Sequence, residues 1–163
     1  MSSRAVFDCM VFLQGAMHAT GPAAACFRLV DNGVIQLCVS AELLAEVKDV
    51  FARPVLQRRY KALAPQNVQT FMVAVAAKAL LITDVASIFS YPRDPKDEPC
   101  VTLAAAAGAR YLVTRDKDLL DLMDQDTPAG KDFCQCFPGL AILDPSAFLR
   151  EFSEKEEEKT QPG

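Results

Sequence analysis

Four acidic residues of this chain, Asp8, Glu46, Asp97 and Asp116, have the type and spacing that metal chemistry requires. Each stands where a predicted strand ends or on the helix that follows it, so an alternating fold brings all of them to one rim of a parallel sheet. Clustered carboxylates repel one another and raise some of their own pKa values. A hard divalent cation, Mg²⁺ or Mn²⁺, relieves that repulsion, and the pattern therefore predicts a metal site.

Other kinds of site find little support. His18 is the one histidine of the chain, which argues against His-rich zinc sites and against a catalytic triad with an imidazole base. The net charge is −4, and the charged segment 154–159 supplies about half of it, so the body of the protein is nearly neutral. A nucleic-acid substrate would then be held by metal ions and a few local Arg and Lys residues.

Length and composition indicate one globular domain. The chain has 163 residues, of which 51% are apolar and 23% charged, a balance typical of a globular fold. We expect a domain over residues 1–152 and a charged, disordered tail over 153–163. The sequence shows neither a secretory signal nor an apolar run long enough for a bilayer, so we expect a cytoplasmic protein with no membrane contact, whose six cysteines are reduced.

Hydrophobic patterning predicts strands that alternate with helices. The predicted strands are 5–7, 34–39, 80–85, 111–114 and 140–143. The predicted helices are 22–31, 41–53, a short piece between Pro54 and Pro65, 66–79, an Ala-rich helix that opens at Asp97 and ends at Gly108, 117–123 and 145–152. Five strands in this order imply a three-layer α/β/α fold with a mainly parallel sheet, which binds ligands beyond the carboxyl ends of its strands.

Each acid also has a structural explanation. Asp97 and Asp116 are each suited to cap the helix that follows them, and for Asp97 alone the two interpretations are evenly balanced. Glu46 lies on a helix face with other charged residues, so a solvated surface is the stronger interpretation when it is taken in isolation. Asp8 ends an apolar strand, and an ion pair with an arginine is its main alternative.

Four segments together resemble the PIN-domain family of metal-dependent ribonucleases, in particular its bacterial toxin components of toxin-antitoxin pairs. They are a strand ending in Asp8, Ser40 followed by the helix with Glu46, the turn 94–97 before an Ala-rich helix, and Tyr-Leu-Val-Thr-Arg-Asp-Lys-Asp-Leu-Leu at 111–120. The resemblance spans residues 5–152.

The resemblance implies that Asp8, Glu46, Asp97 and Asp116 are the catalytic residues and bind one or two Mg²⁺ or Mn²⁺ ions, with Thr114 supporting the site. It implies an endoribonuclease for single-stranded RNA that leaves a 5′ phosphate and a 3′ hydroxyl. It also implies a small antitoxin protein as partner, and a homodimer. The sequence leaves open whether Asp94 or Asp118 joins the metal site.

Met10 departs from the family pattern, which usually has Asn two residues after the first Asp. A thioether cannot donate the hydrogen bonds of an amide, and loss of such a supporting partner costs roughly 10- to 100-fold in affinity or activity. A catalytically impaired PIN-fold module that binds RNA or protein is therefore an alternative. A phospho-acceptor domain of the receiver type is disfavoured, because the acids are spread over four segments.

The sequence offers several cations as phosphate contacts. Those nearest the predicted rim are Arg115 and Lys117, with Arg93 and Lys96 in the adjoining loop. Arg58, Arg59 and Lys61 would extend the same path, although surface solvation is the simpler explanation for any single one.

Overall fold

A buried parallel sheet forms the centre of the structure, a computed structural model that describes residues 2–83, 85 and 98–160. The described strands are β1 (Ser3–Phe7), β2 (Ile35–Val39), β3 (Leu80–Leu81), β4 (Tyr111–Val113) and β5 (Ala141–Leu143). They form one sheet in the order β3-β2-β1-β4-β5, and every neighbouring pair is parallel. The central strand β1 is fully buried from Ala5 to Phe7, as a strand covered on both faces must be.

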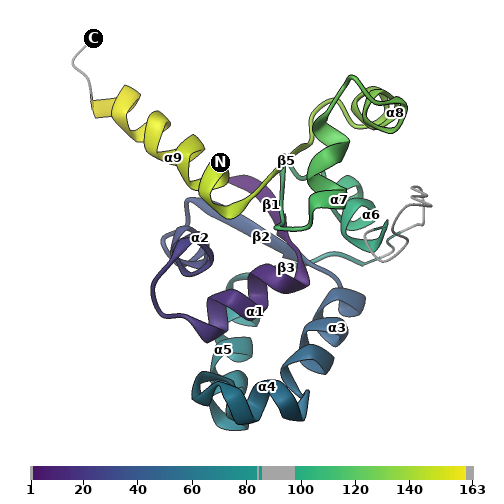
Figure 1. Cartoon of the computed structure of the whole chain (residues 1–163). Helices are drawn as coiled ribbons and strands as arrows, with labels where there is room; N and C mark the ends of the chain where they lie inside the picture. The colour runs from purple at the N-terminus through teal and green to yellow at the C-terminus, as the bar shows by residue number, and fades with distance from the viewer. Residues whose placement is uncertain (1, 84, 86–97, 161–163) are drawn as a thin grey trace.

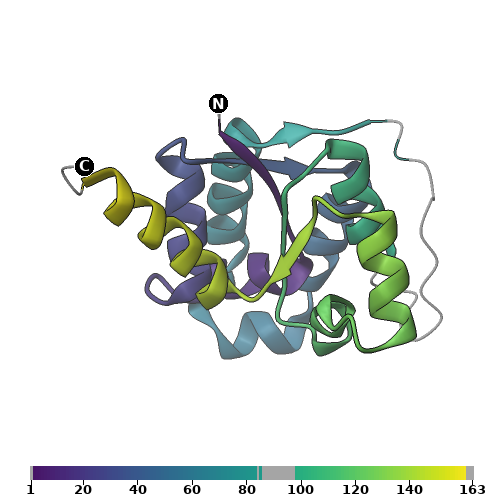
Figure 2. The same ribbon diagram turned by 90° about the horizontal axis from the view of Figure 1, so that it is seen from above.

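Helices cover both faces of this sheet (Figures 1 and 2). The helices are α1 (Cys9–Met17), α2 (Pro22–Asp31), α3 (Ala41–Phe51), α4 (Pro54–Arg59), α5 (Pro65–Lys78), α6 (Glu98–Ala107), α7 (Lys117–Leu120), α8 (Pro128–Cys136) and α9 (Pro145–Thr160), with 3-10 turns η1 (Lys61–Leu63) and η3 (Asp121–Met123). Helices α2, α5 and α9 lie on one side, and α6, α7 and α8 on the other. The predicted three-layer α/β/α fold with a mainly parallel sheet of five strands is confirmed.

The strand order reverses between β1 and β4. The chain passes from β1 to β2 and on to β3 at one edge, whereas from β3 it crosses to β4 and on to β5 at the other edge. Such a reversal leaves a crevice at the carboxyl ends of the two central strands, where ligands of open α/β sheets bind. Asp8 follows β1 directly, and Asp116 follows β4 by three residues.

Helix α3 shows how local sequence fixes an element. The Ser40 hydroxyl accepts a hydrogen bond from the backbone N–H of Leu43 at 3.1 Å and caps the helix start. The predicted apolar stripe of α3 is buried, at Leu43, Val47, Val50 and Phe51. The capping residue and the apolar stripe both indicate a helix here, and the predicted helix 41–53 differs from the structure only at its last two residues.

Several segments differ from the sequence predictions, among them α8, where no helix was predicted. Helix α1 was not predicted, because its run Met10–Leu13 is apolar without a break and gives no helical periodicity. Its close packing on α2 depends on Gly15, where an added Cβ would lie 2.6 Å from the ring of Phe27. Strand β3 is shorter than the predicted range 80–85: Leu80 and Leu81 lie at the sheet edge with exposed side chains, and residue 84 lies outside the described residues.

The C-terminal helix α9 packs its first turns on the sheet. Phe148 is buried and makes edge-to-face contacts with Phe7 of β1 and Tyr111 of β4, with ring centroids 5.9 and 5.3 Å apart. The boundary predicted after residue 152 falls inside this helix, and the division into a domain of residues 1–152 and a tail of residues 153–163 stays a prediction.

Candidate metal centre

Asp8 is held in place by both central strands. Its backbone N–H donates to the carbonyl of Val113 at 3.0 Å, continuing the register that pairs Phe7 with Val113. Its carboxylate Oδ1 accepts from the backbone N–H of Val11 at 3.0 Å, so Asp8 is the N-cap of α1. Its Oδ2 accepts from the hydroxyl of Thr114. Among the described residues, this cap and this hydroxyl are the partners of the carboxylate, in place of the arginine ion pair that was its predicted alternative.

Thr114 connects two of the acids. Its buried hydroxyl donates to Asp8 and accepts from the backbone N–H of Asp116 at 2.9 Å. The Asp116 Oδ1 accepts from the backbone N–H of Asp118 at 2.8 Å. Asp116 therefore caps α7, which is the structural explanation that the sequence offered for it. The segments after β1 and β4 are thereby joined by hydrogen bonds at the point where the strand order reverses. Because Asp8 and Asp116 each cap a helix through a side-chain oxygen, both carboxylates are held at the carboxyl ends of β1 and β4.

The charges of these acids are coupled. Asp8 is only 7% exposed, and burial raises the pKa of its carboxyl to about 6. The hydrogen bonds from Thr114 and Val11 act in the opposite direction, and the negative charges of Asp116 and Glu46 raise the pKa further. Asp116 and Glu46 therefore both lie within electrostatic reach of Asp8.

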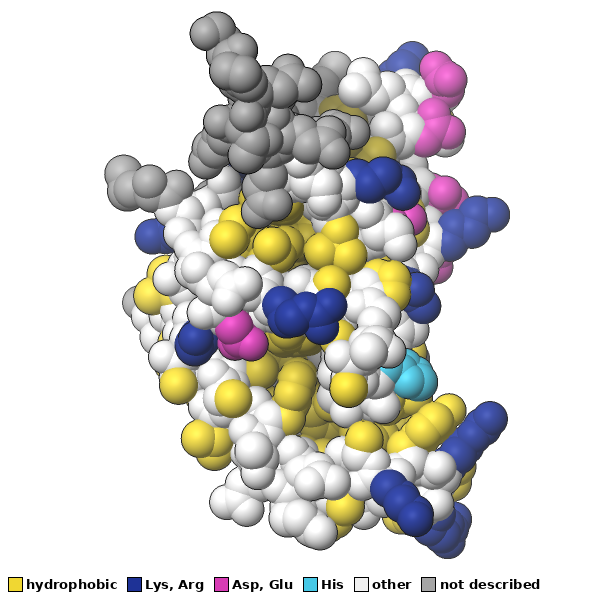
Figure 3. All heavy atoms as spheres, turned by 90° about the vertical axis from the view of Figure 1, so that its left-hand side faces the viewer, with side chains coloured by type: hydrophobic (Ala, Val, Ile, Leu, Met, Phe, Trp, Pro, Cys, Tyr) yellow, Lys and Arg dark blue, Asp and Glu magenta, His cyan; other side chains and the backbone are white. Residues whose placement is uncertain are grey.

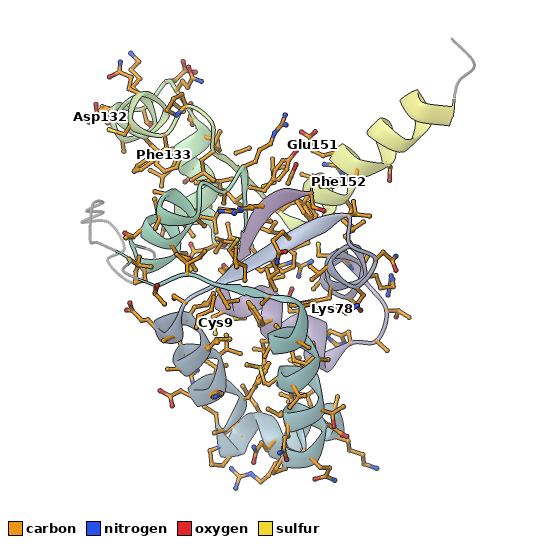
Figure 4. The ribbon with its side chains drawn as sticks, turned by 180° about the vertical axis from the view of Figure 1, so that it is seen from behind. Cys9, Lys78, Asp132, Phe133, Glu151 and Phe152 are labelled. Carbon is orange, nitrogen blue, oxygen red and sulfur yellow. The ribbon has the colours of Figure 1, made fainter. Side chains whose placement is uncertain are left out.

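Glu46 reaches this edge from α3. It is exposed on that helix, which agrees with the solvated-face interpretation, yet its charge acts on groups at the start of α1. Burial raises the pKa of the Cys9 thiol to about 12, and Glu46 and then Asp8 add to that shift, while Arg53 lowers it. Figure 4 shows Cys9 where the sheet meets α3. Neither Cys9 nor Arg53 was singled out from the sequence, because only the fold brings the segment after α3 to the start of α1.

Asp97, the fourth predicted acid, lies outside the described residues, as do Asp94, Arg93 and Lys96. Within the ranges that the structure describes, no three His, Cys, Asp or Glu side chains form a group that could hold a metal ion. Asp116 and Glu46 are thus each near Asp8, but the three acids do not converge on one point. Their chemistry still fits a divalent cation, because carboxylate oxygens are the ligands that such cations prefer. One of the three, Asp8, is also buried, and a bound cation would offset the free-energy cost of burying its negative charge.

Fold and site together define an α/β/α protein with carboxylates at the switch point of a parallel sheet. Residues 4–118, more than half of the chain, match the family model described as PIN domain. The chain belongs to the PIN-domain family, whose members are generally metal-dependent nucleases that use divalent ions and bind nucleic acid. Searches of curated proteins and of solved structures gave no match. In the part of the chain that the structure describes, no helix has the length and apolar character needed to span a membrane.

Proposed function

We propose that this protein is a metal-dependent endoribonuclease for single-stranded RNA and the toxin component of a cytoplasmic toxin-antitoxin pair. The observation that supports it most is the buried carboxyl of Asp8, with a pKa raised to about 6 beside two further acids. Burial of a carboxyl close to other acids destabilises the metal-free protein, and perturbed groups of this kind gather at functional sites. The location at the switch point of the sheet supports the same proposal.

In this proposal Asp8, Glu46, Asp97 and Asp116 are the catalytic residues, and they hold Mg²⁺ or Mn²⁺. When bound, such an ion activates water and stabilises negative charge on the scissile phosphate. Thr114 fixes the Oδ2 atom of Asp8 and the backbone of Asp116, so both carboxylates keep their orientation without metal. Asp8 in its ionised form is the ligand, and its protonation near pH 6 would weaken binding. The products would carry a 5′ phosphate and a 3′ hydroxyl.

RNA cleavage by matched variants tests this function. The native protein should cut labelled single-stranded RNA when Mn²⁺ is present and should leave it intact in EDTA. Asp8→Asn keeps the capping oxygen of α1 but removes the charge, so it should lose cleavage while remaining folded. Asp132→Asn, at an exposed position of α8, is the control and should cut as the native protein does. Equal cleavage by Asp8→Asn and the native protein would refute the assignment.

Met10 favours a second candidate, a PIN-fold module that binds RNA or protein with impaired catalysis. Its side chain is 47% exposed in the first turn of α1, two residues after Asp8, where the family usually has Asn. The described acids also do not form a three-ligand group. RNA binding without cleavage by the native protein, together with cleavage by Met10→Asn, would establish this candidate in place of the first.

An antitoxin and a second copy of the chain are the partners that we propose. Among the apolar residues predicted as a contact face, Val75 is buried, and Val68 and Phe71 pack partly against the core. Beside them a groove of about 470 Å³ opens between α3 and α5, with Met72 and the exposed Val73 in its wall. This groove supports the proposal of a helical protein partner. Light scattering on the isolated protein tests the homodimer, since a monomer mass would refute it.

A further inference from the structure

A small cavity lies between the end of α1, the start of α2 and the segment after β4. Its volume is about 110 Å³, which is enough for a single tetrahedral anion. The polar residues that line it are Gln14 and His18 at the end of α1, Thr20 and Arg115, and residues 21–24 complete the wall. Among the described residues no acidic side chain lines this cavity, although Asp116 directly follows Arg115 in the sequence.

The polar groups around the cavity have spare capacity for an anion. Arg115 and His18 are exposed, and within the described ranges neither side chain makes a hydrogen bond or ion pair. The guanidinium offers several donors, and an imidazole offers one in either neutral tautomer. Helix α2 begins at Pro22, and Gly21 before it, with a φ of 118°, gives no side-chain cap. The positive end of α2 therefore adds to the charge of Arg115.

The cavity adjoins the acidic site. Arg115 directly precedes Asp116, and the cavity is therefore anchored to the same segment after β4 as the acids. Along α1, Gln14 lies six residues after Asp8, which at 1.5 Å per residue is about 9 Å. Figure 3 shows the histidine side chain (cyan) at the surface, with Lys and Arg side chains (dark blue) both above and below it. An RNA strand that passes the acids can thus continue over this cavity.

We propose that the cavity binds a phosphate of the RNA strand next to the one that is cleaved, with Arg115 as its main ligand and His18 and Gln14 as hydrogen-bond donors. The inference rests on the proposed function and names the way in which the same site holds its substrate. It gives a nearly neutral protein a local anchor for RNA. The acids would then act on a scissile phosphate whose position is set by its neighbour.

Binding measured without cleavage tests the cavity on its own. We would titrate the protein into a fluorescently labelled single-stranded RNA in EDTA and follow the anisotropy at several salt concentrations. Arg115→Ala should weaken binding roughly tenfold, because a charge-assisted hydrogen bond is lost. The slope of log K against log salt should become shallower by about 0.7, the value of one phosphate contact on a single strand. Lys131→Ala, which removes an exposed cation of α8, is the control and should change neither quantity.

A second variant and a short substrate separate this role from a general effect of charge or folding. Thr20→Asp places a negative charge at the start of α2, which is compatible with the helix, but it should weaken RNA binding as Arg115→Ala does. A dinucleotide without terminal phosphates has no second phosphate, so the loss of binding caused by Arg115→Ala should be much smaller for the dinucleotide than for longer RNA.

Unchanged binding of long RNA by Arg115→Ala would overturn the cavity proposal. The proposal would also be overturned if Arg115→Ala lost as much affinity for the dinucleotide as for long RNA. The two proposals fail in different ways. Cleavage that does not depend on Arg115 refutes the cavity alone, whereas Arg115-dependent binding without cleavage by the native protein refutes the nuclease and leaves the cavity standing.

Discussion

Replacing Asp8 by Asn should stabilise the metal-free protein at neutral pH. Burial, with the charges of Asp116 and Glu46, raises the pKa of this carboxyl from its ordinary value of 3.8 to about 6. The folded protein therefore binds the proton more tightly than the unfolded chain. The stability that the folded state gains from this tighter proton binding is fully present below pH 3.8. It declines as the pH rises and is lost above pH 6. At pH 7.5 the folded state carries the full cost of the ionised carboxyl.

The size of this cost follows from the two pKa values. A gap of about 2.2 pH units at 1.36 kcal/mol per unit corresponds to about 3 kcal/mol at pH 7.5. At pH 5 the folded state is already mostly protonated and the cost is about half as large. Asn removes the charge and caps a helix about as well as Asp, although it gives up a favourable interaction with the positive end of α1. We therefore expect a gain of about 2 kcal/mol or more at pH 7.5.

Urea unfolding of the native protein, Asp8→Asn and the control Asp132→Asn measures this gain, with EDTA present at pH 7.5 and pH 5. The midpoint of Asp8→Asn should lie above that of the native protein at pH 7.5, and the difference should shrink at pH 5. The control should match the native protein at both pH values. A midpoint of Asp8→Asn below the native one at pH 7.5, or a gain that does not change with pH, would refute the electrostatic account of this site.

Three further substitutions test other parts of the structure. Thr114→Val should lower the free energy of unfolding by about 1–3 kcal/mol, because the carboxyl of Asp8 loses a buried donor; Thr114→Ser should recover most of it, and equal loss in both would contradict the hydrogen bond. Gly130→Ala should destabilise by about 1–3 kcal/mol or more in thermal melts, because its Cβ would collide with a backbone carbonyl of the preceding loop, whereas Gly139→Ala meets nothing within 4 Å and should be neutral. Met10→Asn should raise RNA cleavage roughly 10- to 100-fold, and unchanged rates would show that this side chain does not limit the reaction.

The sequence predicts those parts of the fold that local patterns specify. Ser40 with the stripe at Val47 and Val50 defines α3, and the buried segment from Tyr111 defines β4. Helix α1 escapes prediction because the apolar run after Asp8 lacks periodicity. The start of α1 is nevertheless marked by Asp8, which caps it. This signal was missed because Asp8 was interpreted only as the end of a strand.

Local patterns alone predict the residue types of the site, whereas Thr114 as a supporting residue was expected from the resemblance to the PIN-domain family. Which acids meet depends on the register between β1 and β4, which sets Thr114 opposite Asp8 and no local pattern encodes. The effect of Arg53 on Cys9 likewise depends on how the segment after α3 folds back. The place of Asp97 in the site stays a prediction, since it lies outside the described residues.

Calorimetric titration of Mn²⁺ into the metal-free protein tests the central claim, that these carboxylates hold a divalent cation. The native protein and Asp132→Asn should bind Mn²⁺ with the same affinity at pH 7.5, and binding should weaken as the pH falls through 6 because Asp8 takes up a proton. Asp8→Asn should show no such binding. Binding of equal affinity by Asp8→Asn and the native protein would contradict the assignment of this site.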